Sequence, residues 1–388
     1  MSKHLSIAPG LSPGEKSLLS YFVHAADSFS YDKGIKDEFC GAFIPIAMDS
    51  YPLMASILTL AAVHRANAGL FQGHQELAAL QVTAVRQLRM SLSGTPNEAL
   101  VASALILCYA EVISGGGGEI SWRVHLEGVA HLFALDPLLW TVDAPDRTRA
   151  FICRCFVSLV ALANVSRHPP TAAASERALA MIPKVRSPAY IDEFTAYSTD
   201  LTLVLFEVGN ISRQSQLAAT HPTGDNCVDP NKLALHLLHR LEGMTVKSHI
   251  HALEHLCINT LFHQAAKLQI FQRMMGLLPS STEVQQVVRS ILRPLSRFRM
   301  HRGPGVGVLL FFPVFSAGTG AIGQVDRQHV RDMLTNMIQI MGFANIRQGL
   351  DVLEALWLHR DLHGESNMNS SWEGIISKFS CLLNRAVS

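Results

Sequence analysis

Residues Leu309–Trp357 read LLFFPVFSAGTGAIGQVDRQHVRDMLTNMIQIMGFANIRQGLDVLEALW, and this stretch carries the strongest signal of fold in the chain. Its apolar start, Val308–Phe315, is far shorter than the ~18 apolar residues that indicate a membrane span, and it contains Pro313. Alternation of apolar and polar residues with a period of two, which is typical of strands, is scarce here and elsewhere. The stretch therefore favours packed helices over a membrane segment or a sheet.

Most of the chain in front of this stretch also has the pattern of helices. Apolar residues recur at helical spacing over 53–63, and Asn97–Ile113 is apolar nearly all round, as expected of a helix buried on most sides. We predict an all-α fold with many helices packed around a central apolar cavity. Residues 1–14 are expected to form an N-terminal tail, and residues 15–388 a single helical domain.

The charge of the chain argues against direct binding to a nucleic acid. Only 16% of the 388 residues are charged, 48% are hydrophobic, and the formal net charge is +1. No lysine- or arginine-rich run occurs, so the positive surface that usually binds a phosphate backbone is not predicted. We therefore expect no direct DNA binding.

The cysteines and the first residues indicate the compartment. Seven cysteines occur, and none forms a CxxC pair, which favours reduced thiols inside the cell. The opening residues, MSKHLSIAPGLSPGEK, lack the apolar core of a signal peptide. A cytoplasmic location is the expectation.

Four further segments, in order along the chain, carry a resemblance to a known family. They are LLSYFVHAADSF at 18–29, PLMASILTLAAVHRANA at 52–68, ASALILCYAE at 102–111, and WRVHLEG at 122–128, which is close to a W-x-x-H-L-x-G pattern. Together with Phe312-Pro313, Ala317-Gly318, Arg327, Asn345 and Trp357 they resemble the fungal-specific regulatory domain of zinc-cluster transcription factors. That domain normally follows a six-cysteine zinc cluster, which this sequence does not contain.

The sequence is also similar to an offshoot of that family, the non-canonical fungal humulene synthases. This resemblance implies a sesquiterpene cyclase of fungal secondary metabolism that ionises farnesyl diphosphate with Mg²⁺ and cyclises it to a humulene-like hydrocarbon. Those enzymes need a lysine on a helix and lack the usual aspartate-rich motif, and DDxxD is absent here as well. The implied partner is an isoprenoid diphosphate, and a homodimer is left open.

Lys267 is the first candidate for catalysis. It lies in CINTLFHQAAKLQIFQRM at 257–274, among apolar neighbours, so its ammonium group must reach solvent, lose its proton or meet an anion. A diphosphate would supply the anion, and a snorkelling surface lysine is the alternative. His263 lies one turn earlier on the same face and Gln264 at i−3. A hydrogen-bonded core histidine is the alternative for His263.

Candidate metal ligands lie on a second helical segment, LVLFEVGNIS at 203–212. Glu207 and Asn210 are three residues apart and therefore share a helix face, which Asp200 can join from about two turns earlier. Mg²⁺ prefers such hard oxygen ligands. Asn164 follows an apolar helix and could face the same cavity. The alternative is an ordinary structural group, and Arg213 either binds an anion or caps the helix.

Aromatic residues complete the cyclase hypothesis. Phe156, Phe206 and Phe262 could stabilise a carbocation through their ring faces, in an apolar pocket that excludes water. The other hypothesis is a non-enzymatic transcriptional regulator or co-regulator without its zinc cluster. Its cavity would bind an apolar effector or a protein partner, and its location would be nuclear.

Overall fold

Helices make up almost all of the described chain. The structure, a computed structural model, describes residues 10–71, 73–94, 97–115, 121–136, 140, 146–166, 170–182, 191–192, 194–220, 230–244, 253–296, 298, 303, 305 and 307–365. Within these residues the β-structure consists of one isolated antiparallel bridge, between Ile191 and Ser198. The predicted all-α class is confirmed.

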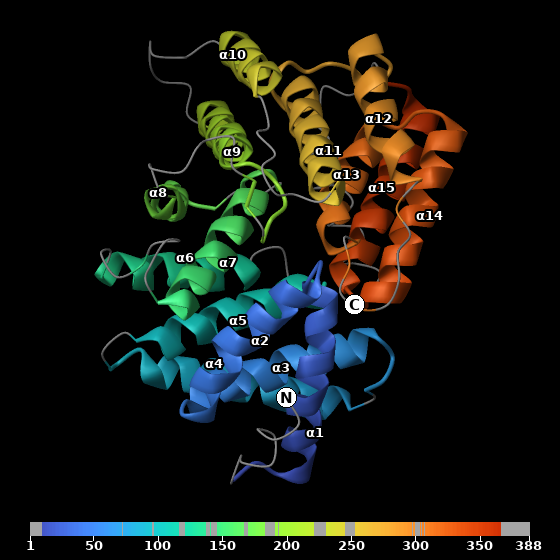
Figure 1. The fold of residues 1–388 in the computed structure, drawn as a ribbon. Helices are drawn as coiled ribbons and strands as arrows, with labels where there is room; N and C mark the ends of the chain where they lie inside the picture. The colour runs from blue at the N-terminus through green and yellow to red at the C-terminus, as the bar shows by residue number, and fades with distance from the viewer. Residues whose placement is uncertain are drawn as a thin grey trace.

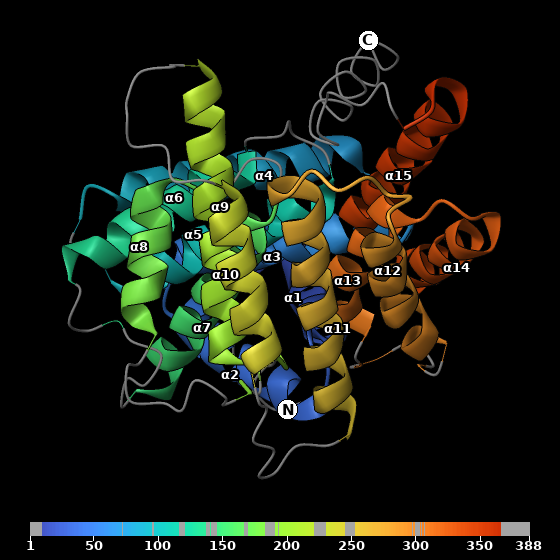
Figure 2. The same ribbon diagram turned by 90° about the horizontal axis from the view of Figure 1, so that it is seen from above.

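The helices follow one another along the chain in a fixed order. They are α1 (Pro13–Ala25), η2 (Ala26–Phe29), α2 (Lys33–Met48), α3 (Tyr51–Asn67), α4 (His74–Ser91), α5 (Glu98–Ser114), α6 (Ser121–Leu135), α7 (Arg147–Asn164), α8 (Ala172–Met181), α9 (Thr199–Thr220), α10 (Pro230–Gly243), α11 (Leu253–Gln269), the π-helical turn η3 (Ile270–Met274), α12 (Thr282–Leu295), α13 (Gly307–Gly320), α14 (Gln324–Met341) and α15 (Ala344–His363). In Figure 1, α1–α5 form the lower part, α6–α10 the upper left and α11–α15 the upper right. Seen from above in Figure 2, α8 and α14 lie at opposite sides.

Side-chain caps explain several helix starts. The hydroxyl of Ser12 accepts a hydrogen bond from Glu15 N, and the Glu15 carboxylate accepts one from Ser12 N, which is a capping box. This cap starts α1 at Pro13, slightly earlier than the boundary predicted at residue 15. Single side-chain caps also start α2, α3, α5, α7 and α8, from Asp32, Ser50, Asn97, Asp146 and Thr171 respectively.

Two apolar helices form the centre of the lower part. Every residue of α3 from Leu53 to His64 is buried, and so is every residue of α5 from Leu100 to Cys108. α3 packs against α1, α2, α4 and α5, whereas α5 also contacts α6, α7 and α15. Their lack of a polar face, visible in the sequence, follows from this enclosure on most sides.

His64 joins the first helices to the last ones. Its Nε2 donates to Met341 O at 2.9 Å, and its Nδ1 accepts from the Tyr21 hydroxyl at 3.0 Å. Burial lowers the pKa of His64 to about 4, so the ring is neutral at physiological pH. A neutral ring with both nitrogens bonded fixes α3 against the end of α14.

The right-hand part is a bundle around α13. α11, α12, α14 and α15 all contact α13, which is apolar along most of its length. No described helix is long and apolar enough to cross a membrane. The central cavity that we expected from the sequence stays a prediction.

Burial determines which thiols can react. Cys40, Cys108, Cys153 and Cys155 are buried, and burial raises the pKa of Cys40 to about 11 and of the other three to about 12. We expect iodoacetamide to leave these four unmodified in the native protein at pH 8 and to alkylate them in urea. Cys257, which is only half-buried, is the internal control. Peptide mass spectrometry measures the outcome, and native alkylation of Cys155 as fast as that of Cys257 would contradict this packing.

Candidate functional site

The predicted site residues lie on three neighbouring helices. α7 carries Phe156 and Asn164, and α11 carries Phe262, His263, Gln264 and Lys267. α9, which contacts both α7 and α11, carries Asp200, Phe206, Glu207, Asn210 and Arg213. The fold therefore brings these elements together, but the side chains divide into separate groups.

One group is a buried polar cluster made by Asn164, Asn210 and Arg213. The Asn164 Nδ2 donates to Val160 O at 2.8 Å, and its Oδ1 accepts from Arg213 Nη1 at 2.8 Å and from Ser175 Oγ at 3.2 Å. Arg213 also donates to Pro170 O at 2.8 Å and to Asn210 Oδ1. Asn164 is fully buried, so this network ties α7, α8 and α9 together.

Gly209 lets α9 approach this cluster closely. A Cβ atom at Gly209 would lie 2.3 Å from Asn164 Oδ1 and 2.5 Å from Asn164 Cβ. Such distances do not occur between real non-bonded atoms, so glycine is required at this crossing. α9 can pack this closely on α7 because Gly209 has no side chain.

One more guanidinium group, that of Arg273, lies next to the cluster, at the end of α7. Arg273, on the π-helical turn η3, donates to Val165 O at 3.0 Å and to Ser166 O at 3.3 Å, just past the end of α7. Burial lowers the pKa of Arg213, and the carboxylates of Glu127 and Glu176 act in the opposite direction. The chemistry of this region is that of cations bound to amide and carbonyl oxygens.

The oxygens predicted to bind Mg²⁺ are engaged with arginines. Glu207 forms an ion pair with Arg240 of α10, and the oxygens of Asn164 and Asn210 accept from Arg213. Asp200 lies in the first turn of α9. Among the described residues no group of three or more His, Cys, Asp or Glu could hold a metal ion. This geometry does not fit a preformed magnesium centre, because arginine side chains already bind the oxygens of Glu207, Asn164 and Asn210, and the magnesium site stays a prediction.

Lys267 meets a carboxylate of the protein itself. Its Nζ lies 3.2 Å from Glu242 Oε1 on α10 and 5.6 Å from the centre of the Phe271 ring, and its side chain is 27% exposed. The alkyl part thus packs on the protein while the ammonium group reaches the surface, as in the snorkelling alternative. The catalytic role of Lys267 stays a prediction.

His263 and Gln264 do not form a joint site with Lys267. Gln264 Oε1 accepts from Ser290 Oγ of α12 at 3.1 Å, whereas Lys267 faces α10. Burial lowers the pKa of His263, so its ring is neutral at pH 7. Gln264 and Lys267 therefore contact different helices, and the role of His263 stays a prediction.

The three predicted aromatic residues are core residues. Phe156, Phe206 and Phe262 are almost completely buried. The Phe156 ring packs edge-on against Phe133 at 4.9 Å between centroids, whereas Phe262 stacks on Tyr197 at 4.6 Å. Phe156 and Phe262 thus belong to different aromatic groups, and their binding of a carbocation stays a prediction.

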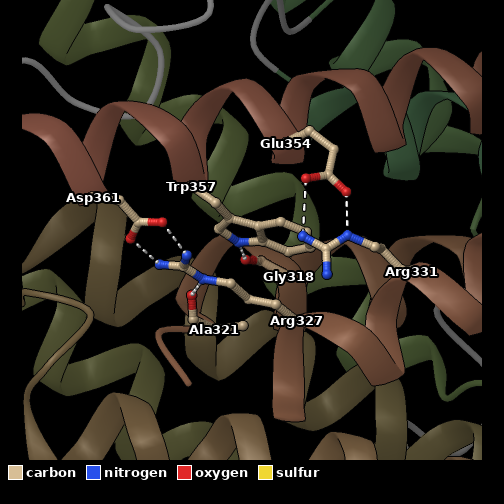
Figure 3. Close-up of polar contacts among 7 residues, drawn as sticks. All are labelled: Gly318, Ala321, Arg327, Arg331, Glu354, Trp357 and Asp361. Carbon is tan, nitrogen blue, oxygen red and sulfur yellow. Dashed lines mark hydrogen bonds and ion pairs between the residues drawn. The ribbon is translucent and has the colours of Figure 1, made fainter. Parts of the chain in front are cut away.

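A further polar group connects α13, α14 and α15, as Figure 3 shows. Trp357 Nε1 donates to Gly318 O at 2.9 Å. Arg327, itself buried, binds the two oxygens of Asp361 at 2.7 and 2.9 Å, and Arg331 binds both oxygens of Glu354. Asp361, Arg331 and Glu354 were missed from the sequence, although Arg331 lies one helical turn from Arg327, and Glu354 and Asp361 lie one turn on either side of Trp357.

The indole of Trp357 lies between the two arginines. The guanidinium carbons of Arg327 and Arg331 are 5.7 and 5.1 Å from its ring centres. A Cβ atom at Gly318 would lie 2.5 Å from Leu353 Cδ1, so this glycine lets α13 approach the Leu353 side chain of α15 closely. We call Gly318, Arg327, Arg331, Glu354, Trp357 and Asp361 the tryptophan clamp.

Comparison with known proteins identifies the lineage. The family model described as fungal specific transcription factor domain matches residues 17–383. The chain belongs to this family. Searches of curated proteins and of solved structures found no match.

In this fungal specific transcription factor domain, the closing signature of the sequence has a structural explanation. Arg327 and Trp357 both belong to the tryptophan clamp, and Gly318 supplies the close approach and the carbonyl that Trp357 binds. These residues of the signature thus join the last three helices. The family is the expected one, whereas the similarity to humulene synthases stays a prediction.

Proposed function

We propose that this chain is a non-enzymatic regulatory domain of the fungal transcription-factor type, acting through a bound effector or a protein partner. The observation that carries the proposal is the family match over 17–383. The tryptophan clamp supports it, because three of the signature residues of the family form that clamp. A nuclear location belongs to the same proposal.

The side chains proposed for catalysis give this function further support. Glu207 is paired with Arg240, Lys267 with Glu242, and Arg213 with two amide oxygens. The pairs Glu207–Arg240, Lys267–Glu242 and Arg213–Asn164 each join two helices, as a structural role requires. Cyclase activity would need several of them to open, and it is the competing hypothesis.

The near-neutral chain suits regulation without direct DNA contact. With a net charge of +1 it lacks the excess of positive charge that binding to a phosphate backbone draws on. DNA would then be reached through a partner. Four arginines of the described residues bind carboxylate, amide or carbonyl oxygens of the protein itself. They are Arg213, Arg240, Arg273 and Arg327.

Two assays on the same chain test the proposal. The chain is fused to a heterologous DNA-binding domain in yeast, and transcription of a reporter is measured against the DNA-binding domain alone. We expect a several-fold change, and we expect Trp357→Ala to weaken it because this variant destabilises the fold. In parallel, purified protein is incubated with farnesyl diphosphate and Mg²⁺, and no hydrocarbon is expected by gas chromatography.

The outcomes separate the two hypotheses. An unchanged reporter together with a hydrocarbon product would overturn the regulatory proposal. Lys267→Ala then decides the mechanism, because the cyclase hypothesis expects this variant to lose the product. Arg89→Ala, on the exposed face of α4, is the matched control for an unspecific loss of charge.

A further inference from the structure

His64 is a buried titratable residue that bonds α3 to α1. Only 6% of the residue is exposed. Its Nε2 bonds to the carbonyl oxygen of Met341, which can only accept, so Nε2 carries the ring proton. The neutral ring therefore has a bare Nδ1, and this atom accepts from the hydroxyl of Tyr21 on α1 at 3.0 Å. Burial raises the pKa of Tyr21, so the hydroxyl keeps the proton that it donates.

A second proton on His64 competes with the hydrogen bond from Tyr21. Nδ1 is the atom that gains this proton, and its lone pair is the one that the Tyr21 hydroxyl occupies. Within the described residues the hydroxyl has no other hydrogen-bond acceptor to which it could turn. The bond to Met341 survives, because a protonated ring still donates from Nε2. Protonation therefore weakens the contact with α1 and leaves the one with the end of α14.

Aromatic rings lie close to the imidazole of His64. Phe29 of η2 and Phe343, which precedes α15, each have their ring centre 5.9 Å from that of His64. Phe29 in turn meets Tyr109 of α5 edge-on at 6.2 Å between ring centres. An imidazolium among these rings would lose the water that stabilises its charge. Burial accordingly lowers the pKa of His64 to about 4.

The charged groups near the imidazole do not balance a second proton. His24 of α1 has its ring centre 6.0 Å from that of Tyr21, and the guanidinium carbon of Arg65 lies 5.7 Å from the same ring. Both side chains are positive in acid. The carboxylate of Asp27 in η2 is bound by Lys36 at 2.5 Å. In the part of the chain that the structure describes, the imidazole forms no ion pair, so the second proton meets positive neighbours and no partner carboxylate.

α1 is the element that can yield most easily at this place. It is the first helix of the described chain, and Figure 1 shows it beside α3 in the lower part. Its main contacts among the described residues are with α3 and η2. A terminal helix with so few packing partners opens locally at a lower free energy than the core. Leu18, Leu19 and Phe22 of α1 are buried, so this opening stays rare while the bond to His64 is intact.

We propose that His64 makes the attachment of α1 acid-sensitive: a proton on Nδ1 displaces the Tyr21 hydroxyl, and α1 then separates from α3. The direction follows from proton linkage. With α1 attached, the pKa of His64 is lowered to about 4, whereas an exposed histidine has the ordinary value of 6.5. The attached state therefore keeps its full advantage above pH 6.5 and loses it as the pH falls towards 4. This inference goes beyond the proposed function and does not rest on it.

Hydrogen exchange of the full chain, followed by mass spectrometry, tests the proposal. Exchange of peptides from α1 is measured at pH 7.5 and at pH 5, and each rate is corrected for the intrinsic exchange rate at that pH. We expect the protection of α1 to fall roughly 20–30-fold at pH 5, as the linked protonation of one histidine implies. Protection in α13 should change much less. Unchanged protection of α1 would overturn the proposal, and so would an equal loss in both helices, which indicates global unfolding.

Variants assign the acid response to His64. His64→Gln keeps a donor for Met341 O but does not titrate, so its α1 should be protected equally at both pH values. His24→Gln removes a histidine of the same helix whose side chain is 77% exposed, and it should respond as the wild type does. If His64→Gln fails to fold, His64→Asn, which does not titrate either, takes its place. A wild-type response in whichever His64 variant folds would refute the role of this residue. Hydrogen exchange needs neither DNA nor a reporter, so failure here is distinguishable from failure of the regulatory function.

Discussion

Trp357→Ala is expected to lower the free energy of unfolding by about 3–5 kcal/mol, the usual range for truncating a large buried aromatic residue. Trp357 is 1% exposed. Its removal leaves a cavity, takes the donor from Gly318 O and takes away the ring over which Arg327 and Arg331 lie. Urea denaturation followed by circular dichroism at 222 nm gives the free energy.

Two further variants show that the effect comes from the clamp. Trp357→Phe keeps most of the ring but leaves Gly318 O without its donor, which should cost less than the alanine variant. Leu362→Ala changes an exposed residue of the same helix, and its effect should stay within about 0.5 kcal/mol. A Trp357→Ala protein as stable as Leu362→Ala would show that the clamp does not hold these helices.

Gly209→Ala is expected to lower the free energy of unfolding by about 1–3 kcal/mol, the cost of overpacking a core. Alanine at an ordinary helical glycine does the opposite and stabilises by up to about 1 kcal/mol. The sign is reversed here because the new methyl group would lie 2.3 Å from Asn164 Oδ1. Asn164 cannot move away easily, since Val160, Ser175 and Arg213 hold its amide.

Gly128→Ala is the matched control for this prediction. Gly128 lies within α6, and a Cβ atom there would meet nothing within 4 Å. This variant should gain about 0.5–1 kcal/mol from helix propensity alone. The same urea titration measures both proteins. Equal shifts in the two variants would mean that the close approach of α9 to Asn164 has no energetic weight.

Most of the fold was predictable because it depends on local patterns. The all-round apolar character of α3 and α5 is visible in the sequence, and so are many caps, since a cap joins residues only two or three apart. The crossing at Gly209 was not predictable. Its reason is a contact with Asn164, which lies on another helix, and no local pattern records that contact.

In the candidate site, too, local spacing was predictable from the sequence, whereas the partners on other helices were not. The i, i+3 spacing of Glu207 and Asn210 predicted a shared face, whereas the two side chains bind different arginines, Arg240 and Arg213. The partners of Glu207 and Lys267 lie on α10, at positions that periodicity cannot supply. In the structure these two side chains form ion pairs between helices.

The hydrogen bond from His64 to Met341 joins two residues that the ribosome adds far apart in time. The two residues are 277 positions apart. At roughly 5–20 residues per second, the ribosome adds Met341 some 14–55 s after His64. During that interval the apolar α3 and α5 have emerged, whereas α14 and α15 do not yet exist. Until then the buried face of α3 at His64 lacks the partner that α14 supplies in the folded protein.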